Sequence, residues 1–511
     1  MPAPALPDAE AVAGCVKAWA AANPRFASLL ASGTPTVQAL TQWSMELLRE
    51  NRTTEAKDAL RAALALDPGS PMLWTNYGAA LNQENSPGEA AAYLEHSLSL
   101  LGSQPDTWVL LGMVRQKLGD PVAAEAAYRA ALEQEPNSIS AWQLLGILKQ
   151  EQRDYAAAVV CLGACLRLGG SDAALLANLA KLHYQLGQFS EARDAYTRAA
   201  DLAPGNPHYR KMALKSDFLL AMIQGESVDK AISGFKNSTL AAGSATEQEL
   251  KDWLHSAFLQ LSGFGHIDAA TRVGRRQLEL WPANPSASYL LKAVAGDSSL
   301  ERSTPEYVVE YFDAVAEGFD AHVVDVLGYD VPEKICSAVR GVTGAGQLYD
   351  TLDAGCGTGL CGPFLRPMSR ALTGVDLSPK MLEQAQKKEI YDALVCEELI
   401  AFLRRSPLQF DLMVAADLMI YFGDLGPIFS GASAALRSGG LLACSTESST
   451  GKGYRVQPSG RFAQSPECVR AMAAAKFEEL VYIETTVRLD AGGRLPGNIF
   501  IFRRRSADRA A

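Results

Sequence analysis

A glycine-rich stretch at residues 352–359, with sequence LDAGCGTG, is the part of the chain whose residue types most plainly serve chemistry. It follows an apolar run that is typical of a buried strand. Glycines there let the backbone turn tightly and let a ligand lie against it. The spacing of Gly357, Gly359 and Gly362 formally matches a dinucleotide-binding fingerprint. Asp353 argues against that match, because a dinucleotide site must accommodate a pyrophosphate beside the first glycine.

Two further acids end the apolar runs that follow. Asp376 lies 17 residues after Gly359, at a position suited to hydrogen bonding with both hydroxyls of a ribose. Asp417 ends a later run, and open α/β sheets bind their ligands at the carboxyl ends of strands. A carboxylate at Asp353 suits the cationic amino group of a bound amino acid. These acids therefore indicate a ligand that carries a ribose and an amino group.

The elements that must position these residues are strands alternating with helices. From about Pro305 the chain alternates short apolar runs with helical stretches, which predicts βαβ units and a parallel sheet. The expected strands lie at 348–355, 371–376, 393–396, 410–417 and 440–447. Two last runs, 477–489 and 497–504, have no helix between them. They predict an antiparallel hairpin at the edge of the sheet.

The first half of the chain repeats every 34 residues. Three residue types keep this step: Trp74, Trp108 and Trp142; Gly78, Gly112 and Gly146; Ala90, Ala124, Ala158 and Ala192. The tryptophan lies on one face of a first helix, the glycine lets a second helix approach closely, and the alanine completes the contact. Residues 108–137 resemble the consensus of the tetratricopeptide repeat. Such arrays present a groove for a peptide or a partner helix, and the alternative is a supporting or dimer-forming role.

The acids and glycines together resemble the motifs of a known enzyme class. Asp353 beside the glycine turn, Asp376 and Asp417 are similar to motifs one, two and four of the class I S-adenosylmethionine-dependent methyltransferases. The resemblance covers residues 304–505. With the repeats, the whole chain resembles the bacterial methyltransferases that are fused to tetratricopeptide repeats. The expected fold is therefore an all-α repeat solenoid followed by a Rossmann-like α/β domain.

The resemblance also implies which residues bind the cofactor, S-adenosylmethionine. The acid of the third motif is Glu397 or Glu398, and we favour Glu398. Tyr307, Tyr311, Phe312 and Phe319 belong to a segment that closes over the cofactor or, alternatively, packs as an amphipathic helix on the sheet edge. The expected cofactor-binding residues are Asp353, Ala354, Gly355, Cys356, Gly357, Gly359, Asp376, Leu377, Met381, Glu397, Glu398, Asp417 and Tyr307.

The acceptor site is indicated by fewer residues. Asp417 and Tyr421 are the candidates for acceptor contact and catalysis. The segment 453–469 is interpreted as an acceptor-binding insertion or, alternatively, a solvated connector. Its candidate substrate-binding residues are Tyr454, Arg455 and Arg461. No Asn-Pro-Pro-Tyr or Pro-Cys sequence follows the fourth expected strand, which argues against a DNA base methyltransferase, and six histidines predict no metal cluster.

Composition limits the class of protein further. The 511 residues include 47 Lys and Arg against 57 Asp and Glu, a net charge of −10 that argues against nucleic acid as a partner. Nine cysteines without a CxxC pair predict free thiols in a reducing compartment. The amino terminus does not resemble a signal peptide, and no uncharged apolar run reaches the roughly 18 residues of a membrane helix. We therefore expect a cytoplasmic protein.

These observations predict a division into five parts. We expect capping helices at 1–36, about five repeats at 37–206, atypical helical repeats and a linker at 207–303, the methyltransferase domain at 304–505 and a tail at 506–511. The expected activity is methyl transfer to nitrogen or oxygen of a protein, peptide or carrier-bound acceptor recruited by the repeats. One alternative is a free small-molecule acceptor, with the repeats forming a homodimer. Another is an inactive scaffold.

Overall fold

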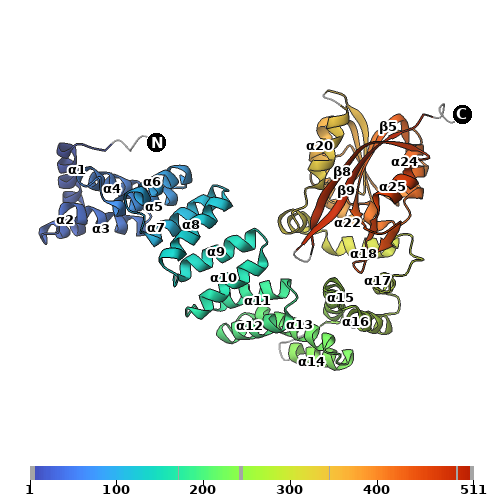
Figure 1. Cartoon of the computed structure of the whole chain (residues 1–511), viewed down its shortest axis with the longest axis horizontal. Helices are drawn as coiled ribbons and strands as arrows, with labels where there is room; N and C mark the ends of the chain where they lie inside the picture. Colours follow the sequence, from blue (N-terminus) through green and yellow to red (C-terminus); the bar gives the residue numbers. More distant parts are fainter. Residues whose placement is uncertain (1–5, 171, 241–245, 344–345, 491–492, 507–511) are drawn as a thin grey trace. The chain divides into compact units, whose positions relative to one another are not determined.

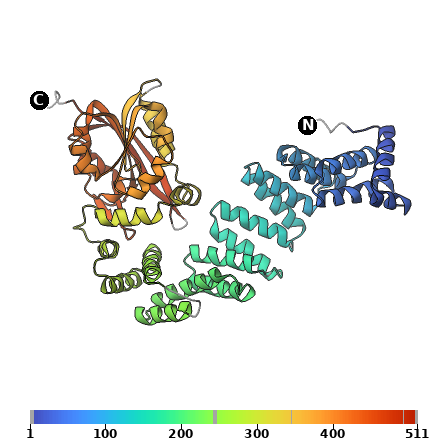
Figure 2. The ribbon, with the colours of Figure 1, turned by 180° about the vertical axis from the view of Figure 1, so that it is seen from behind.

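A computed structural model describes residues 6–170, 172–240, 246–343, 346–490 and 493–506 of the chain. The chain forms two compact units, Met1–Arg210 and Lys211–Ala511 (Figures 1 and 2). Among the described residues no helix is long and apolar enough to cross a membrane. All nine cysteines are free.

The first unit is a series of antiparallel helical hairpins. Its helices are α1 (Ala9–Ala22), α2 (Pro24–Ala31), α3 (Thr36–Arg49), α4 (Thr53–Leu66), α5 (Pro71–Gln83), α6 (Pro87–Leu100), α7 (Pro105–Lys117), α8 (Pro121–Gln134), α9 (Ile139–Glu151), α10 (Tyr155–Arg167), α11 (Ala173–Gln185) and α12 (Phe189–Leu202). From α3 onward, a residue with positive φ stands in the turn of each hairpin. These residues recur every 34 positions and are Asn51, Asn85, Gly119, Arg153 and Gly187.

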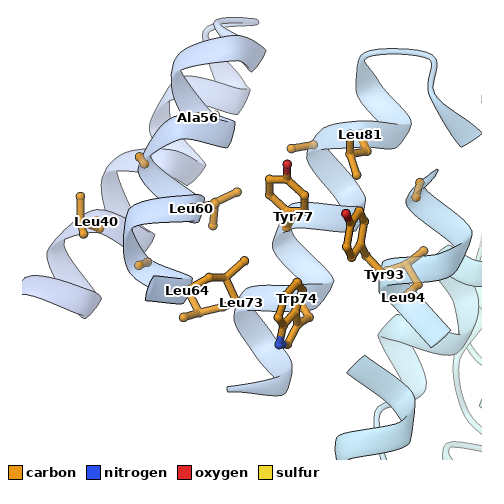
Figure 3. Packing of buried hydrophobic residues seen from close by; sticks show 14 of the residues in the cluster. Leu40, Ala56, Leu60, Leu64, Leu73, Trp74, Tyr77, Leu81, Tyr93 and Leu94 are labelled. Atoms are coloured by element: carbon orange, nitrogen blue, oxygen red, sulfur yellow. The ribbon is translucent and has the colours of Figure 1, made fainter. Parts of the chain in front are cut away.

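The three predicted tryptophans each make the same kind of hydrogen bond. The indole N–H of Trp74 donates to the carbonyl oxygen of Pro68 at 2.9 Å, and Trp108 and Trp142 each bond the carbonyl six residues earlier, at 3.0 and 2.9 Å. The ring of Trp74 also stacks on Tyr93 with 5.7 Å between centroids (Figure 3). Each tryptophan therefore fastens the loop before its own helix.

The predicted glycines bring the two helices of one hairpin together. A Cβ added at Gly78 of α5 would lie 2.8 Å from Leu94 of α6, and one at Gly146 would lie 2.7 Å from Leu162. Gly112 is pressed in the same way by the ring of Tyr128. Carbon atoms do not approach so closely, so only glycine fits at these points.

The second unit begins with helices that keep this design without the strict period. They are α13 (Pro207–Ile223), which spans the boundary, α14 (Val228–Leu240), α15 (Glu247–Gly263), α16 (Ile267–Leu280) and α17 (Pro285–Val294). Gly265 turns the α15–α16 hairpin with φ +79°. A Cβ at Gly274 of α16 would lie 2.9 Å from both Phe258 and Leu291, on α15 and α17.

A mixed sheet forms the rest of the second unit. Its strands are β1 (Tyr349–Ala354), β2 (Ser369–Asp376), β3 (Ala393–Cys396), β4 (Phe410–Ala415), β5 (Leu436–Ser448), β6 (Tyr454–Val456), β7 (Phe462–Gln464), β8 (Phe477–Asp490) and β9 (Gly493–Arg504). The parallel core has the order β3-β2-β1-β4-β5. Strand β9 pairs antiparallel with β5, and β8 pairs with β9. The segment expected to be an insertion or connector forms the β6–β7 ribbon, which joins the end of β5.

Helices cover both faces of this sheet, as the strand pattern requires. They are α18 (Pro305–Val315), α19 (Phe319–Ala321), the π-helix η1 (His322–Val326), α20 (Val331–Thr343), α21 (Gly362–Leu365), η2 (Arg366–Met368), α22 (Pro379–Gln386), α23 (Leu399–Arg404), η3 (Met419–Tyr421), α24 (Gly426–Ala435) and α25 (Pro466–Ala473). Alternate strand residues enter different cores: Leu442 packs with α23 and α24, whereas Leu441 packs with α20. The order of the parallel strands reverses beside β1, where the sequence predicted the ligand.

Candidate active site

The glycine turn after β1 is held open by backbone geometry. Gly355, Gly357 and Gly359 have φ of +70°, +52° and +85°, a region that side chains avoid. The N–H groups of Gly355 and Cys356 donate to the carbonyl oxygen of Val375, at 2.8 and 3.0 Å. The turn is thereby fastened to the end of β2. At Gly357 no atom lies within 4 Å of where a Cβ would be, which leaves room for a ligand against the main chain.

Asp376 stands at the carboxyl end of β2, directly beside this turn. Its Oδ2 accepts the N–H of Gly357 at 2.8 Å, and its Oδ1 accepts the N–H of Ser378 at 2.9 Å. Burial raises the pKa of the Asp376 carboxyl, and these N–H bonds oppose the rise. A carboxylate oxygen accepts more than one hydrogen bond, so both oxygens keep capacity for a ligand's hydroxyls.

Asp353 is almost completely buried under the turn. The hydroxyl of Tyr391 donates to its Oδ2 at 2.7 Å. Burial raises the pKa of Asp353 to about 7, and the nearby Asp376 adds to the rise while the Tyr391 bond opposes it. A cationic group placed beside Asp353 would favour its ionised form.

At the far side of the site, Asp417 belongs to a buried charge network. Its N–H donates to Ser445 Oγ at 2.8 Å, and its Oδ2 accepts Nη1 of Arg488 at 2.9 Å. Arg488 also pairs with Glu447, and the two side chains are 5% and 2% exposed. The other oxygen of Asp417, Oδ1, is buried and has no hydrogen-bond partner among the described residues.

The segment 305–321, which contains α18 and α19, supplies an aromatic wall of the site. Phe312 of α18 meets the rings of Tyr421 and Phe319, with centroids 5.6 and 6.0 Å away. Asp313 accepts the hydroxyl of Ser378 at 2.6 Å, and Asp320 accepts Nζ of Lys388 at 2.6 Å. The segment is therefore attached to the loops around the glycine turn by polar bonds.

The glycine turn, the three acids and the aromatic wall all contribute residues to the lining of one cavity of about 680 Å³. Many of the predicted site residues lie in its wall: Asp353, Gly355, Cys356, Gly357, Asp376, Leu377, Glu397, Glu398, Asp417, Tyr421 and Arg461. Six others are not part of this lining: Ala354, Gly359, Met381, Tyr307, Tyr454 and Arg455. Met381 and Tyr307 are buried in helix packing, Tyr391 covers Gly359, Tyr454 lies against Gly423, and Arg455 is exposed on β6.

The two candidate acids of the third motif have different partners. Glu397 accepts Nε of Arg405 at 2.9 Å. Glu398 caps α23 by accepting the N–H of Ala401 at 2.9 Å, and it pairs with Arg302 at 3.1 Å. Both line the cavity, so both stay candidates for the adenine amino group.

Sequence reasoning missed Arg488, Glu447 and Tyr391. Arg488 is the only cationic residue in the sequence of β8, and that isolation was a usable signal. Glu447 ends a strand in the same way as the recognised acids Asp376 and Asp417. Tyr391 has no comparable signal, because its hydroxyl reaches Asp353 from a loop 38 residues away.

The sheet order, the glycine turn and the acid at the end of β2 define a class I methyltransferase fold. Comparison with known families agrees: a model described as a methyltransferase domain matches residues 352–442, and tetratricopeptide repeat models match 41–105, 105–148 and 144–207. The chain is a tetratricopeptide-repeat protein with a class I methyltransferase domain. That domain implies S-adenosylmethionine as the cofactor. Asp376 and the open glycine turn fit its ribose and its amino acid part.

Individual relatives are distant. The chain is similar to the malonyl-[acyl-carrier protein] O-methyltransferase of Pseudescherichia vulneris, at 27% identity over 139 residues, which are 27% of this chain and 53% of that protein. The match thus spans about half the relative's length. Among solved structures, the N-methyltransferase NodS of Bradyrhizobium japonicum with S-adenosyl-l-homocysteine has 17% identity, covers 39% of this chain and 99% of its own, and has a TM-score of 0.33. Pseudomonas aeruginosa pilF has 17% identity, 49% and 93% coverage and a TM-score of 0.31.

Proposed function

We propose that the protein transfers a methyl group from S-adenosylmethionine to nitrogen or oxygen of a protein, a peptide or a group carried on one, and that the repeat array recruits this acceptor in the cytoplasm. One observation carries the proposal. A single cavity of about 680 Å³ is lined by the glycine turn and Asp376 and also by Asp417, Tyr421 and Arg461. Its volume lies in the range of small-molecule sites, about 300–1,000 Å³.

Methyl transfer requires few catalytic side chains. When bound, S-adenosylmethionine supplies a methyl group on a positively charged sulfur, so the protein must align the acceptor's lone pair with it and exclude water. Tyr311 and Phe312 provide an apolar wall for that purpose. The unpartnered Oδ1 of Asp417 suits a proton or hydrogen bond from the acceptor. Burial raises the pKa of Tyr421 well above its usual range, so its hydroxyl stays protonated and can donate.

The repeats support a macromolecular acceptor. Tetratricopeptide arrays commonly bind peptides or helices along their concave surface. The name of the relative from Pseudescherichia vulneris describes an acceptor group carried on a protein, which is compatible with this arrangement.

The test uses methyl-labelled S-adenosylmethionine, an extract of the source cells, and two variants of the full-length protein. Deleting residues 86–119 removes one repeat between the equivalent turn positions Asn85 and Gly119. In the shortened array Tyr128 packs on Gly78, which stands where Gly112 stood. Asp376→Ala is the control for loss of the cofactor site.

We expect label in a protein fraction with the wild type, a reduced amount with the shortened array, and none with Asp376→Ala. Affinity for S-adenosylhomocysteine should be the same in the wild type and the shortened array. Label only in small molecules, unchanged by the deletion, would instead establish a free small-molecule acceptor. No label in any fraction would identify an inactive scaffold.

A further inference from the structure

Helix α17 (Pro285–Val294) directly contacts a turn of the methyltransferase domain. Tyr289 of this helix is 2% exposed, and its ring lies 4.6 Å from that of Tyr307 on α18, centroid to centroid. The Tyr289 hydroxyl donates to the carbonyl oxygen of Gly460 at 2.5 Å and lies 2.8 Å from Ser303 Oγ. A buried polar group is costly to leave unpaired. The Tyr289 hydroxyl therefore stabilises the position of the turn in which the Gly460 carbonyl accepts its hydrogen bond.

The turn that Tyr289 holds is the one between β6 and β7. Gly460 has φ +80°, and a Cβ there would lie 2.9 Å from Leu290 and 3.0 Å from Tyr289. Within the turn, the N–H of Gly460 donates to the oxygen of Gln457 at 2.8 Å, and the N–H of Gln457 donates to the oxygen of Arg461 at 2.7 Å. The backbone of the turn therefore rests on the helix with no space between them.

This turn carries side chains to the acceptor end of the cavity. Arg461 lines the cavity, and its guanidinium lies 4.0 Å from the carboxylate of Glu447. Gln457 Nε2 donates to Glu447 Oε2 at 2.6 Å. Glu447 pairs with Arg488, which in turn bonds Asp417 at 2.9 Å. A continuous set of contacts thus runs from α17 to Asp417.

The chain that leaves α17 contacts the site a second time. The N–H of Ser303 donates to the carbonyl oxygen of Tyr421 at 2.8 Å. The carbonyl oxygen of Glu301 accepts the N–H of Gly423 at 2.7 Å. Residues 301–303 therefore run beside the segment that presents Tyr421, which is one of the two candidate acceptor contacts.

We propose that Tyr289 and Ser303 are positioning residues of the acceptor site. They hold the Gly460 turn so that Arg461 faces the cavity, and the last helix of the repeat region thereby supports the turn from outside the cavity lining. The inference rests on the proposed function for its link to an acceptor. The mechanical part, that the Tyr289 hydroxyl fastens the turn, stands on the contacts alone.

The first measurement is hydrogen exchange by mass spectrometry on the full-length protein. Tyr289→Phe removes one hydroxyl and keeps the ring. The amides of residues 457–461 should then exchange about tenfold faster, because one net hydrogen bond corresponds to roughly a tenfold change in local opening. Tyr128→Phe is the matched control: it removes a buried tyrosine hydroxyl that donates to Gln116 at 3.1 Å, in the repeat array. It should leave these amides unchanged.

The second measurement separates positioning from general stability. In the labelled-extract assay, Tyr289→Phe should raise severalfold the amount of extract that gives half-maximal transfer, while the maximal rate and the affinity for S-adenosylhomocysteine stay within twofold. Ser303→Ala removes a smaller contact to the same turn and should change both readouts in the same direction by less. Gly460→Ala, which places a methyl group against Tyr289 and Leu290, should produce the largest change in exchange.

Two results would overturn the inference: unchanged exchange at 457–461 in both Tyr289→Phe and Gly460→Ala, or faster exchange with no change in the half-maximal amount of extract. Failure of the proposed function looks different. In that case the wild type itself transfers no label, and the exchange experiment still decides whether Tyr289 fastens the turn.

Discussion

Glycines in helices α5, α7 and α9 differ from those in the turn after β1. Gly78, Gly112 and Gly146 stand inside helices, and each is pressed by a side chain of the neighbouring helix. Gly355 and Gly357 have positive φ, and Gly357 has no atom within 4 Å of where a Cβ would lie. In the array glycine is required because the space is filled. At Gly357 it is required because the backbone must bend beside space that is empty.

The two regions also treat charge differently. The array is packed mainly by apolar contacts, and ion pairs such as Arg52 with Glu55 lie on its surface. The methyltransferase domain buries Arg488, Glu447 and part of Asp417 beside the cavity. Buried charges cost free energy unless they are paired, so each member of this network depends on its partners.

The largest expected effect comes from breaking that network. Arg488→Met leaves Glu447 and Asp417 without their shared partner, and the free energy of unfolding should fall by about 3–5 kcal/mol. The control is Arg370→Met, because Arg370 also pairs with two acids, Asp350 and Asp411, but is 61% exposed. Arg370→Met should lower the free energy of unfolding by less than about 1 kcal/mol. Chemical denaturation would compare the two variants, and equal losses would contradict the expected difference between a buried and an exposed charge network.

Asp353 should make the stability of the second unit depend on pH. Its pKa is raised to about 7 in the folded state, so between about pH 4 and pH 7 the folded protein retains a proton that the unfolded chain has released. The contribution of Asp353 to stability is therefore greatest at low pH and falls as the pH rises through this window. Asp353→Asn removes this titrating group. Relative to the wild type, its free energy of unfolding should rise by up to about 4 kcal/mol between pH 4 and pH 7. A difference that is constant from pH 4 to pH 7 would contradict the raised pKa.

Asp376→Ala should weaken S-adenosylhomocysteine binding by roughly 100-fold, since the charged carboxylate that accepts hydrogen bonds from the two ribose hydroxyls is lost. Asp392→Ala is a matched control. Asp392 accepts the N–H of Leu372 and Nη1 of Arg366, each at 2.7 Å. Leu372 belongs to β2, the strand that Asp376 ends, but Asp392 is not part of the cavity lining. Calorimetry should show that Asp392→Ala binds S-adenosylhomocysteine with near-normal affinity. Normal affinity in Asp376→Ala would refute the ribose assignment.

The smallest effect tests the array. Gly112→Ala puts a methyl group into the ring of Tyr128 and should cost about 1–2 kcal/mol after the gain in helix propensity is subtracted. Gly163→Ala, also within a helix, meets only Arg167 at 3.6 Å and should stabilise by up to about 1 kcal/mol. Thermal unfolding of the two variants should therefore shift in opposite directions. A shift in the same direction would mean that close packing does not explain the glycine period.

The sequence predicted what depends on local or repeated patterns. The 34-residue step identified Gly78, Gly112 and Gly146, and the glycine turn with Asp376 identified one end of the cavity. The other end depends on pairing between distant segments. Arg488 enters the site because β9 inserts between β5 and β8, and Tyr289 meets Gly460 across 171 residues.

The sequence of the 453–469 segment is interpreted as an acceptor-binding insertion or a solvated connector, and its pairing into the β6–β7 ribbon could not be predicted from the local sequence. Arg461 reaches the cavity, whereas Arg455 lies exposed on β6. The same limit applies to Tyr307, whose ring is used in packing against Tyr289 and is not in the cavity lining.

The indole bonds of the repeats give the array built-in optical reporters. Trp74, Trp108 and Trp142 each donate to a carbonyl six residues earlier, so each emission spectrum senses the loop at its own repeat boundary. In a stack where each unit contacts only its neighbours, fraying proceeds unit by unit. Variants that retain one of the three indoles would record where along the array melting starts and how far it spreads.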